Sequence, residues 1–253
     1  MKKIWFGSAL VGAAVLLAGC GKKDANVLTL GTDAKFPPFE MRGGATGADV
    51  VGFDVDVAQA IAAAAGKQLQ IVEMDFDRLL PALADGKVDL VMAALSITPE
   101  RRELADFSAP YYKATQVALI LAGGPVPETK DELKGMRTAA LAGTTGFALA
   151  EELTSAENLR AVASPQAAAV DLMNSQVDLA ILDEQPAILL AERNPEIYLI
   201  RPEFTEEFYG VAVRKGDTNL LEVVNRTLGE ISADGRYDQF VDRWLIRAEE
   251  TAR

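Results

Sequence analysis

Short apolar runs alternate with stretches in which apolar residues recur every three to four positions along most of the chain. The short runs, bounded by turn residues, predict strands, and the longer spacing predicts helices with one buried face. The predicted strands are residues 27–31, 69–72, 88–93, 115–121, 137–141, 177–182, 197–200 and 209–213. Strands that alternate with helices favour an α/β protein with mostly parallel sheets.

Local signals mark several helix ends. The stretch that opens at Asp54 places its apolar residues on one face and stops at Gly66, a predicted C-terminal glycine. Residues 129–132 have the spacing of a capping box, and Ser164-Pro165 supplies an N-cap followed by proline in the first turn.

A weak internal echo suggests two related lobes. Segments 82–90 and 171–179 both run from a helix end into a Val-Asp-Leu strand, and a strand–loop unit precedes each of them. In open α/β sheets the ligand loops follow the carboxyl ends of the strands. We therefore expect binding residues in those loops.

Composition and charge narrow the function classes. The chain has 253 residues, enough for one large or two medium domains, and its 49% apolar and 25% charged residues are typical of a soluble globular protein. The net charge is −12, or −14 without the first nineteen residues, whose charged residues are Lys2 and Lys3. Such a chain lacks the basic surplus for binding nucleic acid.

The residue inventory excludes most enzymes that depend on histidine or cysteine. The sequence has no histidine, and Cys20 is its single cysteine. Imidazole bases, histidine metal ligands, intramolecular disulfides and CxxC chemistry are therefore excluded. We predict no cofactor and no metal site.

The N-terminus has the layout of an export signal. Lys2-Lys3 precede an apolar run over 4–17, which is shorter than the ~20 residues that span a bilayer. Residues 17–20, Leu-Ala-Gly-Cys, resemble a bacterial lipobox. We expect 1–19 to be a signal peptide, Cys20 to be lipidated and 20–26 to form a tether. The alternative is an ordinary signal peptide with an incidental cysteine.

Arg101 is a candidate anion-binding residue. Thr98 and Pro99 predict a helix start, and Arg101 falls in its first turn, beside unpaired backbone N–H groups. The alternative is a surface arginine paired with Glu100 or Glu103. The turn 143–146 is a second glycine- and threonine-rich helix start that could face an anion.

Asp183 is a candidate cation-binding residue, opposite in charge to Arg101. It ends an apolar strand and precedes a helix entry at 184–186, so it could cap that helix or hold an ammonium group. Arg101 and Asp183 together match the carboxylate and ammonium of a free α-amino acid. Phe36 and Phe76 are aromatic residues in predicted loops that could contact a ligand or belong to the core.

Taken together, these segments closely resemble the periplasmic solute-binding proteins for polar amino acids that feed ABC transporters. The resemblance covers essentially the whole mature chain in the expected order. The matching segments are 31–33 with 37–40, 52–57, 96–98 with 100–101, 107–108 with 110–112, 143–146, and 234–237 with Trp244.

The resemblance implies a two-lobed fold, each lobe a mostly parallel sheet flanked by helices, with two hinge strands. Lobe 1 would comprise 27–110 and 213–253, and lobe 2 would comprise 116–208. The hinge would lie at 111–115 and 209–212. The implied function is to bind an amino acid between the lobes and deliver it to a permease by hinge closure.

The resemblance also implies roles for individual residues. Arg101 would bind the ligand α-carboxylate with the backbone N–H groups of Ser96 and Thr145. Asp183 would bind the α-ammonium with the Ser96 hydroxyl and the Ala94 carbonyl.

Other residues would contact the ligand side chain. Phe36 and Phe76 would sandwich it, Asp33 would meet its far end, and Leu141 and Thr144 would line the second lobe. Leu141 and Leu182 stand where some glutamine binders carry Lys and His, and Ala94 stands where Ser or Gly is more usual. Because Asp33 favours a cation or an amide, we expect arginine or another basic residue first, glutamine second and a broad-specificity site third.

The expected protein is a monomeric, membrane-anchored lipoprotein of the periplasm or cell surface, and not an enzyme. One alternative is an enzyme similar to cyclohexadienyl dehydratase on the same fold, with Asp33 or Glu40 as general acid. Turnover of prephenate or arogenate would identify it. Another alternative is the sensor domain of a receptor.

Overall fold

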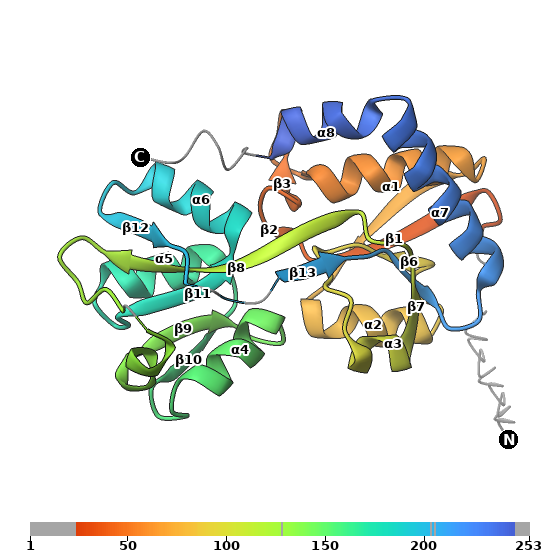
Figure 1. Cartoon of the computed structure of the whole chain (residues 1–253). Coiled ribbons are helices and arrows are strands. Elements are labelled where there is room, and N and C mark those ends of the chain that lie inside the picture. The colour runs from red at the N-terminus through yellow and green to blue at the C-terminus, as the bar shows by residue number, and fades with distance from the viewer. Residues whose placement is uncertain (1–23, 128, 203, 205, 246–253) are drawn as a thin grey trace, which may run out of the picture.

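The computed structural model describes residues 24–127, 129–202, 204 and 206–245, which form two α/β lobes joined by extended strands (Figure 1). The predicted signal peptide, Cys20 and most of the tether lie outside the described residues. Within the described part of the chain, no helix is both long and apolar enough to cross a membrane.

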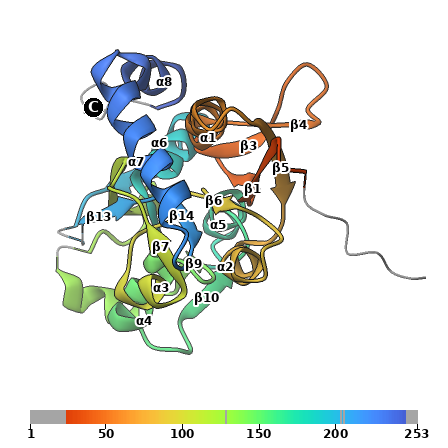
Figure 2. The ribbon, with the colours of Figure 1, turned by 90° about the vertical axis from the view of Figure 1, so that its right-hand side faces the viewer.

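Lobe 1 is built on a five-stranded sheet of order β5-β1-β6-β14-β7. Its strands are β1 (Val27–Thr32), β5 (Gln68–Glu73), β6 (Leu90–Val91), β7 (Ala105–Phe107) and β14 (Ala212–Arg214). Its helices are α1 (Phe53–Ala64), α2 (Phe76–Ala84), α3 (Pro99–Leu104), α7 (Thr218–Ala233) and α8 (Arg236–Trp244). Figure 2 shows α1, α7 and α8 on one side of the sheet and α2 on the other.

Lobe 2 repeats this plan with a sheet of order β10-β9-β11-β8-β12. Its strands are β8 (Tyr112–Leu121), β9 (Thr138–Leu141), β10 (Leu159–Val162), β11 (Leu179–Asp183) and β12 (Ile197–Ile200). The helices α5 (Pro165–Met173) and α6 (Glu184–Arg193) pack on one core, and α4 (Thr145–Leu153) with the 3₁₀ helix η1 (Lys130–Gly135) packs on the other.

Alternation of side chains along the central strands produces two cores in each lobe. Leu90 and Met92 point into the core beneath α1, whereas Val91 and Ala93 point into the core beneath α2. This period of two explains why these segments read as continuous apolar runs, because both faces of each sheet are covered by helices.

The predicted α/β class with mostly parallel sheets is confirmed, with one reversed strand in each lobe. In lobe 1, β14 runs antiparallel to both of its neighbours, and in lobe 2, β8 does the same. The other strands of each sheet are linked by helices within their own lobe, which keeps them parallel. The reversed strands are the two that the chain reaches through the inter-lobe connections.

Two strands carry the chain between the lobes. The first half of β8, Tyr112 to Thr115, pairs antiparallel with β13 (Glu206–Tyr209), and its second half pairs with β11 and β12. The predicted strand 209–213 is interrupted at 210–211, because the chain there changes partner from β8 to the lobe 1 sheet.

An aromatic cluster anchors these strands to lobe 1. Phe39 and Phe53 are fully buried, with ring centroids 6.0 Å apart. The Phe39 ring also lies 5.0 Å from Tyr112 on β8 and 5.3 Å from Tyr209 on β13, measured between centroids. Both strands that connect the lobes, β8 and β13, are therefore packed against the core of lobe 1 by aromatic contacts.

Most local signals are confirmed, and one is wrong. Thr98 and Ser164 cap their helices through their side chains, and Gly66, at φ 67°, follows α1. Thr129 makes no side-chain cap, because the Glu132 N–H that a capping box needs is bonded to the Thr129 carbonyl in a 3₁₀ turn.

The strands that the sequence did not reveal are short. They are β7, β10, β13 and the small sheet of β2 (Lys35–Phe36), β3 (Glu40–Gly43) and β4 (Asp49–Val51). Charged residues or glycines interrupt each of them, so none has a clear apolar alternation.

Asp54 has a structural role within segment 52–57, one of the segments that resemble the family. Its Oδ1 accepts a hydrogen bond from the Tyr111 hydroxyl at 2.8 Å, and its Oδ2 accepts one from the Ala94 N–H at 2.8 Å. Burial raises the pKa of the Asp54 carboxyl to about 6. Ala94 itself has a positive φ of 47°, so Asp54 stabilises an unusual backbone conformation just after β6.

Replacing Asp54→Ala should lower the free energy of unfolding by roughly 2–4 kcal/mol, because the buried Ala94 N–H and Tyr111 hydroxyl lose their acceptor. Urea denaturation measures this change. Gln59→Ala, at an exposed position of the same helix, should change stability by less than about 0.5 kcal/mol. Equal effects of the two substitutions would contradict the anchoring role of Asp54.

Candidate functional site

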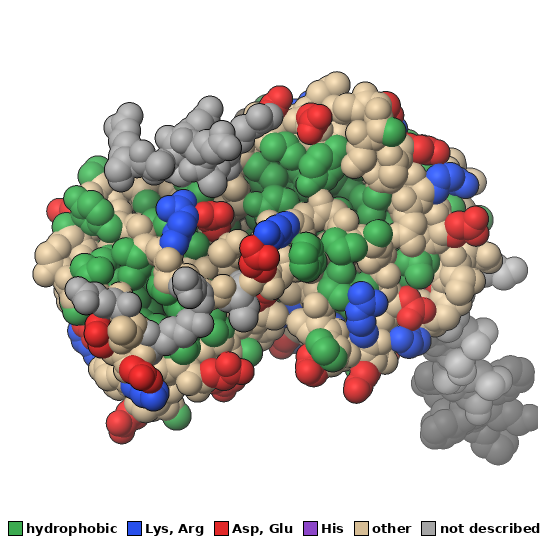
Figure 3. Space-filling model, in the orientation of Figure 1, with side chains coloured by type: hydrophobic (Ala, Val, Ile, Leu, Met, Phe, Trp, Pro, Cys, Tyr) green, Lys and Arg blue, Asp and Glu red, His purple; other side chains and the backbone are tan. Residues whose placement is uncertain are grey.

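A cavity of about 360 Å³ lies between the lobes and is lined by residues of both. The molecular outline is indented between the lobes in the space-filling view (Figure 3). All ten residues predicted from the sequence line this cavity: Asp33, Phe36, Phe76, Ala94, Ser96, Arg101, Leu141, Thr144, Thr145 and Asp183.

The topology explains why residues so distant in sequence meet here. Asp33 follows β1 and Ala94 follows β6 in lobe 1, whereas Thr144 follows β9 and Asp183 ends β11 in lobe 2. Each therefore stands at the carboxyl end of a parallel strand, and these ends of the two sheets face one cavity.

Arg101 spans the cavity from lobe 1 to lobe 2. Its guanidinium donates to the Ser96 carbonyl at 2.8 Å and to the Gly143 carbonyl at 3.2 Å. The guanidinium carbon Cζ also lies 5.3 Å from the centroid of the Phe76 ring. Burial lowers the pKa of Arg101, and the nearby Glu207 partly opposes that change.

The surface alternative for Arg101 does not describe this structure. Among the described residues, Arg101 forms no ion pair with Glu100 or Glu103, and its guanidinium turns into the cleft instead. Thr98, the N-cap of α3, accepts from the Arg101 N–H at 3.2 Å and so fixes the backbone from which the side chain starts.

Asp183 does not cap the helix that follows it. Although it occupies the N-cap position of α6, its side chain makes no cap hydrogen bond. Its Oδ1 instead accepts from the Tyr209 hydroxyl at 2.7 Å and from Gln116 Nε2 at 3.0 Å. Burial is the main reason that the pKa of the Asp183 carboxyl is raised to about 7; the hydrogen bond from Tyr209 opposes this rise and the nearby Glu207 adds to it.

Glu207 is a functional candidate that sequence reasoning missed. Its Oε2 accepts hydrogen bonds from the Ser96 hydroxyl of lobe 1 and from the Thr145 hydroxyl of lobe 2, both at 2.6 Å. It lies on β13, two residues before Tyr209, so both side chains share one face of the strand. The alternation places Glu207 on the same face as Tyr209, but it does not show that this face turns towards the cleft.

These bonds decide which groups are left for a ligand. Because Ser96 and Thr145 give their hydroxyl protons to Glu207, the Ser96 oxygen can still accept from an ammonium group. The Thr144 side chain caps α4 through the Phe147 N–H at 3.1 Å. The first backbone N–H groups of α4, including that of Thr145, are of the kind a helix leaves unpaired.

The two phenylalanines do not lie in loops, which corrects the sequence prediction. Phe36 belongs to the two-residue strand β2, and Phe76 is the first residue of α2. Both are half-buried and line the cavity, and Phe36 packs against the cores of both lobes. The strand β2 is too short to leave a period in the sequence, and Phe76 lies at the boundary of its helix, which a periodic pattern locates least well.

Asp33 is not an isolated acid. Its Oδ2 accepts from the Phe76 N–H at 3.1 Å, and its Oδ1 lies 3.3 Å from Lys35 Nζ. Burial raises the pKa of Asp33, and Lys35 opposes this change. Lys35 itself lines the cavity and was not predicted.

The described residues contain no group of three or more acidic, cysteine or histidine side chains placed to hold a metal ion. The polar groups of the cavity are a guanidinium, carboxylates, hydroxyls and backbone groups. This set can bind a small zwitterion by paired charges and hydrogen bonds.

Known proteins resemble the chain over nearly its full length. A "Probable histidine-binding protein" of Neisseria gonorrhoeae is 31% identical over 262 residues, which covers 98% of this chain and 97% of that protein. The "ABC transporter arginine-binding protein 1" of Escherichia coli (strain K12) is 32% identical, with 93% of this chain and 98% of the relative covered.

A solved structure described as an ancestral arginine-binding protein bound to glutamine matches with a TM-score of 0.80 at 34% identity, covering 87% of this chain and 97% of that one. The model of the family described as bacterial extracellular solute-binding proteins, family 3, matches residues 28–247. This chain belongs to that family.

Proposed function

We propose that this protein binds a free polar L-amino acid, basic such as arginine or else glutamine, in the cleft and delivers it to an ABC-transporter permease. The observation that carries the proposal is the meeting of Arg101 and Asp183, from opposite lobes, in one cavity. The names of the relatives, which are histidine- and arginine-binding proteins, support the same ligand class.

The charged and polar groups of the cavity can bind the α-carboxylate and the α-ammonium that all free amino acids share. Arg101 binds the ligand carboxylate, assisted by the N–H groups of Ser96 and Thr145. Asp183 binds the ammonium, together with the Ser96 hydroxyl and the Ala94 carbonyl. Phe36 and Phe76 hold the side chain between them, Leu141 and Thr144 form the wall of lobe 2, and Asp33 meets the far end.

Binding is coupled to closure of the lobes. In this proposal residues 27–110 with 213–253 form lobe 1, 116–208 form lobe 2, and 111–115 with 209–212 are the hinge. Pairing of Tyr112 to Thr115 with β13 supports the position of the first hinge segment, and β13 ends at Tyr209, where the second segment begins. The ligand stabilises the closed state to the extent that it contacts both lobes.

The protein acts outside the cytoplasm and performs no chemical conversion of its ligand. Residues 1–19 are removed as a signal peptide, and lipid at Cys20 holds the monomer on the membrane of the periplasm or cell surface. The tether keeps the closed form near its permease. The sequence of the N-terminus supports export and anchoring, and the names of the relatives, which are binding proteins, support the absence of a chemical conversion.

Arg101→Ala and Asp183→Ala should each weaken amino-acid binding by about 100-fold or more, because each leaves a ligand charge buried without its partner. Titration calorimetry of the full chain in mild detergent, against arginine and glutamine, measures this loss. Arg102→Ala removes a neighbouring exposed guanidinium and should leave affinity unchanged. Unaltered binding by either site variant would contradict the role given to that residue.

Affinity should fall as the pH is lowered from 8 to 5. The ligand ammonium needs the Asp183 carboxylate, whose pKa is raised to about 7 by burial, so binding below that pH must release a proton. The expected loss approaches about tenfold per pH unit below 7. Calorimetry in buffers of different ionisation enthalpy detects the released proton.

The pH test has an internal control. Asp183→Asn removes the titrating group, and its weakened residual binding should no longer depend on pH over this range. If the affinity of the unaltered protein did not change with pH, the role given to Asp183 would be contradicted.

Glu207→Ala should shift the ligand-free protein towards an open arrangement of the lobes. The substitution removes two hydrogen bonds to a charged acceptor, one from each lobe, each contributing roughly 1.5–3 kcal/mol. Small-angle scattering should show a larger radius of gyration.

Glu206→Ala is the matched control, because Glu206 lies on the same strand, is exposed and pairs with Lys113. The same increase in radius for both variants would contradict a specific inter-lobe role of Glu207.

A further inference from the structure

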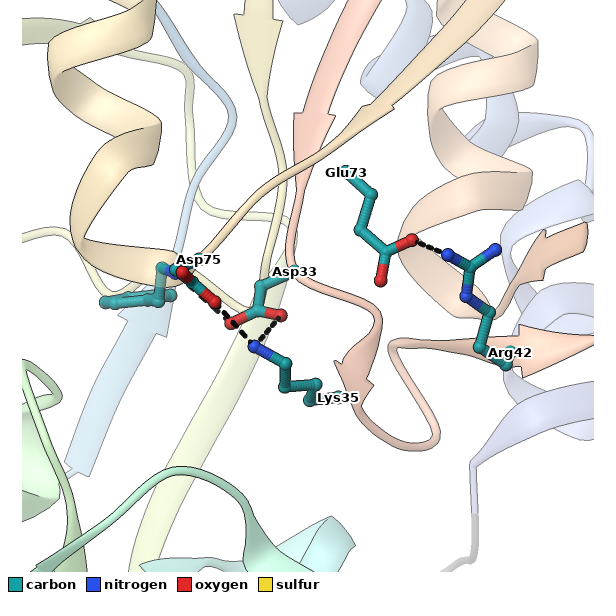
Figure 4. Close-up of polar contacts among 6 residues, drawn as sticks. Asp33, Lys35, Arg42, Glu73 and Asp75 are labelled. Atoms are coloured by element: carbon teal, nitrogen blue, oxygen red, sulfur yellow. Dashed lines mark hydrogen bonds and ion pairs between the residues drawn. The ribbon is translucent and has the colours of Figure 1, made fainter.

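Lys35 brings a positive charge to the end of the cavity where Asp33 lies. Its Nζ is 2.8 Å from Asp75 Oδ1 and 3.3 Å from Asp33 Oδ1. Figure 4 shows the amine between the two carboxylates, with the separate Arg42–Glu73 ion pair further away. Lys35, Asp33 and Asp75 all line the cavity.

The two carboxylates differ in their exposure. The Asp33 side chain is 13% exposed, whereas that of Asp75 is 65% exposed and lies largely in solvent. Water and salt therefore screen Asp75, and the charge of Asp33 acts most strongly in the cavity. Asp77 also lines the cavity, but on the exposed side of the opening turn of α2.

Asp33 retains one place for a ligand donor. Its Oδ2 is occupied by the Phe76 N–H, whereas its Oδ1 is buried and receives no hydrogen bond from any described residue, with Lys35 as its ion-pair partner. The lysine side chain is 44% exposed, so its amine can move by the small distance that a ligand requires.

This end of the cavity thus offers one acceptor and one donor side by side. A primary carboxamide carries the matching pair, an N–H₂ donor and a carbonyl acceptor. A guanidinium or ammonium group has donors and no acceptor, and it would meet the like charge of Lys35. Of the lobe 2 residues that line the cavity, Leu141, Val162 and Ala163 have apolar side chains that offer an amide no hydrogen bond.

We propose that Lys35 is a specificity-determining residue that makes the site prefer glutamine over arginine. The inference rests on the proposed function, and it reverses the order expected from Asp33 alone. Lys35 neutralises the buried carboxylate against a cationic side chain and supplies the donor that the amide carbonyl needs.

The test compares the dissociation constants of glutamine and arginine for the full chain in mild detergent, before and after Lys35→Met. The unaltered protein should bind glutamine more tightly. In the variant, affinity for glutamine should fall by about tenfold through loss of a charge-assisted hydrogen bond. Affinity for arginine should rise by a similar factor, because Asp33 is then free for the guanidinium.

Two controls separate this role from a general effect of charge. Lys35→Arg keeps a cationic donor and should keep the preference for glutamine. Lys87→Met removes the same charge at an exposed site outside the cavity and should change neither affinity.

The outcomes distinguish the two proposals. A ratio of dissociation constants that changes by less than about threefold in Lys35→Met, or a preference of the unaltered protein for arginine, would overturn the role of Lys35 while leaving amino-acid binding intact. Failure of the unaltered protein to bind any amino acid would overturn the proposed function itself.

Discussion

The buried positive charge of Arg101 is the constraint on which the rest of the cleft depends. A guanidinium in a cavity must be hydrogen-bonded and balanced by negative charge, or its burial is strongly unfavourable. Here it donates to carbonyls of both lobes, and Glu207 and Asp183 are the acids that oppose its desolvation. The lobes therefore meet around one charge, and the groups that neutralise it come from both of them and from the strand between them.

Two layers of residues serve this arrangement. The groups that face the cavity are held by others behind them: Tyr209 and Gln116 orient Asp183, and Glu207 orients the hydroxyls of Ser96 and Thr145. Tyr209 and Glu207 both lie on β13, which also pairs with β8 between the lobes. Movement of the lobes and orientation of the binding groups thus share one short strand.

At one end of the cavity, the neighbouring Lys35 changes which ligand group Asp33 favours. Asp33 alone favours a cationic side chain first and an amide second. With Lys35 Nζ at 3.3 Å, the same carboxylate becomes half of a donor–acceptor pair that fits an amide. Nothing in the order of residues 33–36 shows which side chains turn towards the cavity, because the bend after β1 sets that direction.

The sequence by itself determined the α/β class and the alternation of strands and helices, since apolar periodicity and helix-start signals are local. It could identify Thr98 and Ser164 as caps for the same reason. The placement of the ten predicted residues in one cleft came from the resemblance to the solute-binding family, because local periodicity does not show which distant strand ends meet. The sequence could not identify β13, Glu207, Gln116 or Lys35 as parts of the site, and it misread the cap at Thr129. Only tertiary structure decided these, because hydrogen bonds between β13 and two lobes, and an ion pair across a bend, depend on distances that no spacing in the chain encodes.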